Sequence, residues 1–192
     1  MKTIFADILL HTYKTPQTAA RKLLDLNLPF EVSIFALVGS ISASIIVTFF
    51  LSGMQSIEVA PGFPTLGPLT LAVIVTVLTV LLVVGLVFAG KPFSGTGTFA
   101  QAATLVAWTQ IVQLGLQLVQ VIIGSVSLVI ASLFGLAATV YMLWVLISFV
   151  NVLHNLNSVG KSIVVFLMAV VGIALVLSVL VTLSGFTPPQ PH

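Results

Sequence analysis

The stretch that decides the fold is FAQAATLVAWTQIVQLGLQLVQVIIGSVSLVIASLFGLAATVYMLWVLISFVNVLH, residues 99–154, in which no Asp, Glu, Lys or Arg occurs. It lies within a longer uncharged segment, Pro92–Gly160. Because about 20 apolar residues in a helix cross the hydrocarbon core of a bilayer, the stretch is long enough for two crossings but too short for three with their connections. We expect the chain to turn between the two crossings at Gly124 and Ser125.

Composition extends this conclusion to the whole chain. Of its 192 residues, 59% are hydrophobic and only 5% are charged, whereas about 25% of the residues in an ordinary soluble domain carry a charge. Uncharged stretches also cover residues 32–57, 59–90 and 162–192, and each is long enough for at least one crossing. These runs lack the alternation of apolar and polar residues that membrane β-barrel strands show. The sequence therefore predicts an all-α, polytopic integral membrane protein with five transmembrane helices.

The expected organisation has three parts. Residues 1–32 form a cytoplasmic amphipathic segment, residues 33–186 form the five-helix membrane domain, and residues 187–192 form an extended proline-rich tail. The expected spans are 33–52, 69–89, 99–123, 126–150 and 162–184.

Two short amphipathic helices are predicted in the N-terminal segment, before the first span. Thr15 followed by Pro16 is typical of a helix start, and the helix after them carries an apolar stripe with polar residues on the opposite face. Such a helix suits the headgroup region of a membrane, although a solvated helix docked on a partner would show the same pattern. The stripe consists of Ala19, Ala20, Leu23 and Leu24.

The basic residues predict the orientation of the chain. With five spans, every Lys and Arg falls on one side of the membrane, while Glu58 falls on the opposite side. Because positively charged loops stay in the cytoplasm, we expect a cytoplasmic N-terminus and a C-terminus across the membrane. The basic residues are Lys2, Lys14, Arg21, Lys22, Lys91 and Lys161.

A ladder of glutamines runs along the third expected span. The four residues are spaced by three, four and three positions, so at 100° per residue they fall within an arc of about 80°. An unpaired amide in hydrocarbon is costly, so these side chains must face other helices, a polar cavity or another copy of the chain. Hydrogen bonding between helices is one explanation, and a polar groove for a lipid headgroup or small solute is the functional alternative. The ladder consists of Gln110, Gln113, Gln117 and Gln120.

A second polar face closes the fourth span, near the expected cytoplasmic interface. Its residues recur at the intervals of one helix face, and we interpret it as a capped helix end. The histidine in it is a poor metal candidate, because zinc sites need three or four ligands and the only other histidine expected on that side is His11. The face consists of Asn151, His154, Asn155 and Ser158, followed by Lys161.

The tripeptide Gly160-Lys161-Ser162 resembles the end of a phosphate-binding loop. It lacks the first glycine of that motif, whose position holds Asn155, and it lacks a preceding strand. We therefore interpret Lys161 as a positively charged anchor at the start of the fifth span, and we expect no nucleotide binding. The turn SGTGT, residues 94–98, has glycines that suit a tight connection, with Thr98 as a helix cap.

The expected spans contain no Asp, Glu, Lys or Arg, and the chain contains no cysteine. Pumps and ion-coupled transporters carry charges within the membrane, and a hydrolytic site needs a base beside a nucleophile. We therefore expect no catalytic residue, no metal, no cofactor and no nucleic-acid partner. The expected partners are membrane lipids and either a second copy of the chain or another membrane protein.

Two segments resemble the Yip-one domain family, small membrane proteins named for interaction with Ypt/Rab GTPases. GKPFSGTGTFAQAATLVAW, residues 90–108, resembles the entry to the family's third helix, and LHNLNSVGKSIVV, residues 153–165, resembles the loop between its fourth and fifth helices. TPQTAARKLLDLNLP, residues 15–29, resembles the lead-in of bacterial members. The motif residues of the first segment are Gly95, Gly97, Thr98, Phe99, Gln101 and Trp108.

The resemblance implies five spans with the termini on opposite sides, in agreement with the charge argument. For a bacterial-type member it implies the inner membrane and a periplasmic C-terminus. DLNLP, residues 25–29, stands where eukaryotic members have a DLYGP-type stretch, so Rab binding is not carried over. We expect a non-enzymatic protein that organises, shapes or scaffolds the membrane, and the alternative is a lipid or small-solute conduit lined by the glutamines.

Overall fold

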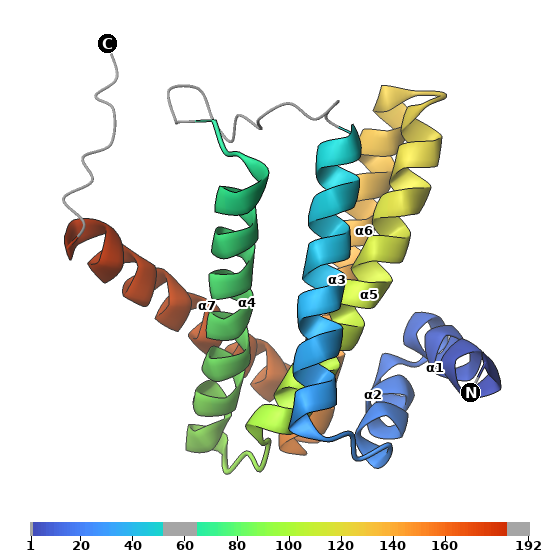
Figure 1. Cartoon of the computed structure of the whole chain (residues 1–192). Helices are drawn as coiled ribbons and strands as arrows, with labels where there is room; N and C mark the ends of the chain where they lie inside the picture. Colours follow the sequence, from blue (N-terminus) through green and yellow to red (C-terminus); the bar gives the residue numbers. More distant parts are fainter. Residues whose placement is uncertain (1, 52–64, 184–192) are drawn as a thin grey trace.

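The structure of the chain is a computed structural model that describes residues 2–51 and 65–183. In these residues two short N-terminal helices precede five long ones, and all regular structure is helical (Figure 1). The elements are α1 Lys2–Lys14, α2 Pro16–Asp25, α3 Phe30–Leu51, α4 Pro68–Gly90, the 3-10 turn η1 Lys91–Phe93, α5 Phe99–Gly124, α6 Leu128–His154 and α7 Val159–Leu183.

The five helices α3 to α7 are each long and apolar enough to cross a membrane. The prediction of an all-α polytopic membrane protein with five spans is therefore confirmed. The expected turn after the third span is also present, because α5 ends at Gly124. The hydroxyl of Ser127 then caps α6 by accepting a hydrogen bond from the backbone N–H of Ile130 at 3.4 Å.

Several helices are longer than the spans expected from the sequence, and their additional residues include charged ones. α3 begins at Phe30, so Glu31 lies in its first turn, and α7 begins at Val159, so Lys161 lies in its first turn. The expected spans, 33–52 and 162–184, begin three positions after these helices and therefore exclude both charges. A charged side chain at the end of a span reaches the polar interface, and a carboxylate at a helix N-terminus is also stabilised by the helix dipole.

The positions of the turns agree with a five-span topology. The α4–α5 turn, which contains Lys91, and the α6–α7 turn, which precedes Lys161, lie at the end of the bundle where α2 connects to α3 (Figure 1). We call this end the basic end and the opposite one the distal end. Glu58, position 52 and the proline-rich tail lie outside the described residues, and the orientation in the membrane stays a prediction.

The tightest packing lies in the half of the bundle near the basic end. Every side chain from Ala102 to Trp108 of α5 is buried, and so are most of those from Val145 to His154 of α6. The alanines of α5 let neighbouring helices approach closely, as small residues do in membrane bundles. Toward the distal end α7 leans away from the other helices (Figure 1), and most of its side chains from Val170 onward are exposed.

Thr12, whose side chain is fully buried, holds α1 against the bundle. Its hydroxyl accepts a hydrogen bond from Nε1 of Trp108 at 2.9 Å and donates one to the carbonyl of Ile8 at 2.9 Å. Its own carbonyl accepts a hydrogen bond from the hydroxyl of Tyr141 at 2.8 Å. One residue of α1 is therefore bonded to both α5 and α6.

α2 packs its apolar stripe against α5 and α6. Ala19 and Ala20 have no exposed surface, Leu23 is also buried, and Leu24 packs on the core at its edge. The sequence pattern assigns this stripe to the membrane surface or to a partner, whereas in the structure the bundle of the same chain covers it. The location of α1 and α2 at the membrane interface stays a prediction.

An ion pair connects α1 with α2. The ammonium group of Lys22 donates a hydrogen bond to Oδ2 of Asp7, and Nε2 of His11 lies 3.5 Å from Oδ1 of the same carboxylate. The hydrogen bond from Lys22 is the main reason that the pKa of Asp7 lies below its usual value. Because this pKa is depressed in the folded state, the contribution of the pair is present at neutral pH and is lost as the pH falls through the lowered pKa.

Replacing Thr12 by valine should weaken the docking of α1. The variant keeps the size of the side chain but leaves the buried indole N–H of Trp108 without its acceptor, at a cost of about 1–3 kcal/mol. We expect faster hydrogen exchange of the α1 amides in Thr12→Val, measured by mass spectrometry in micelles. Thr12→Ser retains the hydroxyl and should exchange like the native protein. Equal exchange in Thr12→Val and the native protein would show that α1 is held by other contacts.

Candidate functional site

The four glutamines of the ladder line one groove of about 600 Å³. The groove lies between α3, α4, α5 and α6, and most of its other lining side chains are apolar. On α5 the lining extends from Val106 to Gln120, which corresponds to about 21 Å of helix at 1.5 Å per residue. The structure thus brings to one surface the side chains that share an arc in the sequence pattern.

Two of the four amides connect α5 with its neighbours. Nε2 of Gln117 donates a hydrogen bond to Oγ1 of Thr48 on α3 at 2.8 Å, and Nε2 of Gln120 donates one to the carbonyl of Ala131 on α6 at 3.3 Å. A Cβ atom on Gly135 would lie 2.5 Å from Nε2 of Gln120, so the glycine leaves room for this amide. Hydrogen bonding between helices therefore accounts for half of the ladder.

The other two amides, those of Gln110 and Gln113, line the groove without a partner. Neither makes a hydrogen bond with any residue that the structure describes. Amides in a largely apolar groove retain unsatisfied donors and acceptors, which favours a polar ligand or water as their partner. The sequence pattern could not separate these two residues from Gln117, because helical spacing gives the direction of a side chain but not its partner.

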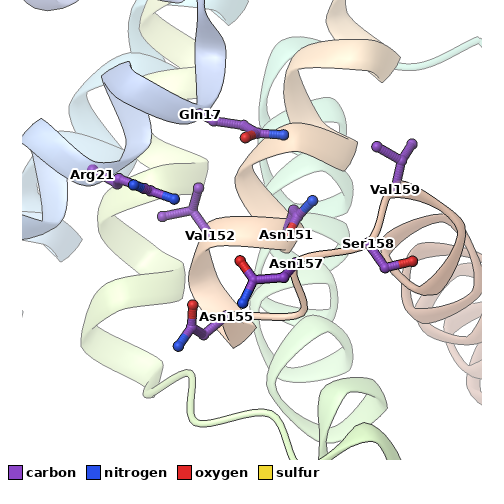
Figure 2. Close-up of a pocket in the computed structure, with 8 residues that line it drawn as sticks. All are labelled: Gln17, Arg21, Asn151, Val152, Asn155, Asn157, Ser158 and Val159. Atoms are coloured by element: carbon purple, nitrogen blue, oxygen red, sulfur yellow. The ribbon is translucent and has the colours of Figure 1, made fainter.

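The residues of the second polar face, predicted at the end of the fourth span, do not all lie together in the structure. Three of its residues line a pocket of about 250 Å³ at the basic end, together with two residues of α2 (Figure 2). Lys161 lies outside this pocket with its side chain exposed. Spacing within the fourth span could not show that α2 returns to cover the end of α6. The lining residues are Gln17, Arg21, Asn151, Val152, Asn155, Asn157, Ser158 and Val159.

His154 turns away from that pocket and is almost fully buried, with 2% of its surface exposed. Its Nε2 lies 2.9 Å from the carbonyl oxygen of Leu86 on α4, and the backbone N–H of Gly97 donates a hydrogen bond to Nδ1 at 3.3 Å. Because Nδ1 accepts, the proton of the neutral ring lies on Nε2. This placement corrects the interpretation of His154 as part of the polar face, since the ring joins α4, the α4–α5 turn and the end of α6.

Three glycines leave the space that this imidazole occupies. A Cβ atom on Gly90, Gly95 or Gly97 would lie less than 3.0 Å from a ring atom of His154. We call these glycines and the imidazole the glycine cradle. The sequence pattern predicts only a tight turn for Gly95 and Gly97, because their partner lies 57 residues after Gly97 and no local pattern connects them.

The remaining motif residues of the turn hold the start of α5. The hydroxyl of Thr98 accepts a hydrogen bond from the backbone N–H of Gln101, and Oε1 of Gln101 accepts one from the backbone N–H of Thr98. This reciprocal pair is a capping box, so the expected cap at Thr98 is confirmed. Phe99 packs edge-on against Phe88 of α4, with ring centroids 6.0 Å apart, and Trp108 bonds to α1.

Gly95→Ala should destabilise the protein, because the new methyl group overlaps the buried imidazole. Overpacking of this kind typically costs about 1–3 kcal/mol. Gly172→Ala on α7 is the matched control, since a Cβ there would meet no atom within 4 Å. Thermal unfolding in detergent, followed by tryptophan fluorescence, should show a lower midpoint for Gly95→Ala alone. Equal midpoints in the two variants would show that the cradle is not needed for stability.

Gly160, Lys161 and Ser162 form the first turn of α7 rather than a phosphate-binding loop. The preceding element is a helix, and the buried hydroxyl of Ser162 donates a hydrogen bond to the carbonyl of Ser158 at 2.8 Å. A phosphate-binding loop needs a strand before it and a hydroxyl that is free to bind a metal ion. Among the described residues, no group of three or more potential metal ligands occurs.

These features define a helical integral membrane protein that is tightly packed at one end and grooved toward the other. The chain belongs to the Yip1 domain family, whose family model matches residues 10–181. The match confirms the family resemblance carried by the turn into α5 and by the α6–α7 loop. No curated protein and no solved structure matches the chain.

Proposed function

We propose that this Yip1-type membrane protein is not an enzyme and that it organises or shapes the bilayer around it. The observation that carries the proposal is the arrangement of α1, which is bonded to the bundle on one side and presents large apolar side chains elsewhere. A helix of this kind inserts its apolar face between headgroups and acyl chains. Because α1 is fixed to the spans, this insertion would act on the leaflet at a set position beside the bundle.

The bundle covers only part of the apolar surface of α1. Ile8 faces the bundle and is 2% exposed, whereas Ile4 is 50% and Leu10 is 52% exposed. Among residues 4–14, the polar side chains other than the buried Thr12 and the aromatic Tyr13 fall within about 60° of the helix circumference at 100° per residue, so much of the uncovered surface there is apolar. Contact with lipid would cover this surface favourably. The polar residues within this 60° arc are Asp7, His11 and Lys14.

The side chains that line the glutamine groove and the pocket at the basic end support a non-enzymatic role. The described lining of the groove consists of amides, hydroxyls and apolar groups, without a titratable side chain. In the described lining of the pocket at the basic end, Arg21 is the only charged side chain, and no carboxylate or imidazole lies beside it. General acid–base catalysis needs a group that gains and loses a proton near the operating pH.

We also propose that the basic end faces the cytoplasm of a bacterial cell, with the protein in the inner membrane. Support comes from the basic residues of α1, α2, the α4–α5 turn and the first turn of α7, because positively charged segments stay in the cytoplasm. The proposed partners are membrane lipids and either a second copy of the chain or another membrane protein. The described basic side chains are Lys14, Arg21, Lys22, Lys91 and Lys161.

Leu10→Glu should reduce the effect of the protein on vesicles, because a carboxylate on the apolar face opposes its insertion into lipid. We expect several-fold less tubulation than with the native protein at the same protein-to-lipid ratio, measured by electron cryomicroscopy of reconstituted liposomes. Lys14→Gln changes a polar residue of the same helix, outside its apolar face, and should behave like the native protein. Native-like tubulation by a folded Leu10→Glu protein would refute the proposed role of α1.

A second function, binding or conduction of a lipid or small polar solute, is favoured by the groove. Its apolar walls extend for about 21 Å along α5 at 1.5 Å per residue, and they surround the unpartnered amides of Gln110 and Gln113. An amphipathic molecule with an apolar chain and a hydrogen-bonding group matches this combination of surfaces.

Gln113→Leu should remove the ligand without a loss of stability, because this amide has no partner among the described residues. Bound lipid, measured by native mass spectrometry, or solute flux in proteoliposomes should fall several-fold at an unchanged unfolding temperature. Gln117→Leu removes the bond to Thr48 and should cost about 0.6 kcal/mol of stability, the mean for hydrogen bonds between membrane helices. Full retention of lipid and flux in Gln113→Leu would exclude this second function.

A further inference from the structure

The pocket at the basic end is separate from both the glutamine groove and the exposed face of α1. We propose that it binds a phosphate-bearing anion, either the headgroup of a phospholipid or free phosphate. The pocket has a volume of about 250 Å³ and is built by α2, the end of α6 and the start of α7 (Figure 2). Its binding chemistry is independent of the membrane-organising role proposed above.

Arg21 supplies the positive charge of the site. Its guanidinium extends from α2 toward the end of α6 (Figure 2). Among the described residues of α1 and α2, the ion pairs are those of Asp7 with Lys22 and His11, so Arg21 has no carboxylate partner there, Asp25 included. A guanidinium with free N–H groups binds phosphate oxygens well, because its planar fork offers two parallel hydrogen bonds.

Asn151 is the second observation that points to a ligand. Its side chain is only 9% exposed, yet its amide makes no hydrogen bond with any residue that the structure describes. It lies among the other lining residues in Figure 2. No polar atom of this side chain is completely closed off from solvent, so a ligand in the pocket can reach it. Buried amides in native proteins are nearly always hydrogen-bonded, and a ligand would complete this one.

The remaining polar groups add hydrogen-bond donors and no negative charge. Asn155 and Asn157 have positive φ angles of 53° and 49°, a backbone conformation that asparagine adopts more readily than most residues. Val159 belongs to the first turn of α7, where the helix dipole favours an anion, while Oγ of Ser158 accepts a hydrogen bond from the N–H of Lys161 at 3.4 Å. No acidic side chain lines the described pocket, so its charge selects an anion over a neutral ligand.

The test uses the full-length protein in neutral detergent, with inorganic phosphate and short-chain phosphatidylglycerol as the two probes. Affinities are measured by isothermal titration calorimetry. Arg21→Gln keeps most of the length of the side chain and should weaken binding by about tenfold or more, because it removes a charge-assisted hydrogen bond. Asn157→Gly tolerates the positive φ and should weaken binding by about fivefold. This second variant tests the site even if Arg21→Gln fails to fold.

Lys161→Gln is the matched control, because it removes one positive charge at the same end from a side chain outside the pocket. It should bind like the native protein. Binding of phosphatidylglycerol alone would assign the site to a lipid headgroup, and binding of inorganic phosphate alone would assign it to free phosphate; binding of both would support the shared chemistry. Equal losses in Arg21→Gln and Lys161→Gln, or no binding of either probe, would overturn the proposal.

Discussion

The packing of one imidazole against three glycines holds together the basic end of this membrane domain. His154 bonds to the carbonyl of Leu86 on α4 and to the N–H of Gly97 in the following turn. Within lipid, apolar side chains gain little by leaving one apolar neighbour for another, so helix association depends on close packing and polar contacts. The glycine cradle supplies both, because the missing side chains let the ring approach and bond to the carbonyl of Leu86 and the backbone N–H of Gly97.

Tight packing at one end leaves the helices free to diverge at the other. Buried side chains concentrate near the basic end, whereas α7 leans outward toward the distal end (Figure 1). The groove between α3, α4, α5 and α6 follows from this geometry. The glutamines of α5 have two roles in this arrangement. Gln117 and Gln120 form hydrogen bonds to neighbouring helices, whereas the amides of Gln110 and Gln113 line the groove without a hydrogen-bond partner among the described residues.

The number of spans and the turn between α5 and α6 were predictable because the thickness of the hydrocarbon restricts helix length. Local chemistry also identified the cap at Thr98, whose partner is only three residues away. The contacts between distant segments were not predictable, because Gly97 with His154 and Thr12 with Trp108 meet only through helix packing. Hydropathy placed the start of the first span at position 33, whereas α3 begins at Phe30 and includes Glu31, because a helix can continue from the hydrocarbon into the polar interface.

The bonds of Thr12 have a consequence for the order of events during biosynthesis. Trp108 lies 96 residues further along the chain, and Tyr141 lies 129 residues further. At a translation rate of about 5–20 residues per second, the ribosome adds Tyr141 about 6–26 s after Thr12. α1 is therefore unable to complete its docking until the chain has been extended to Tyr141, and its apolar side must be accommodated elsewhere during that interval.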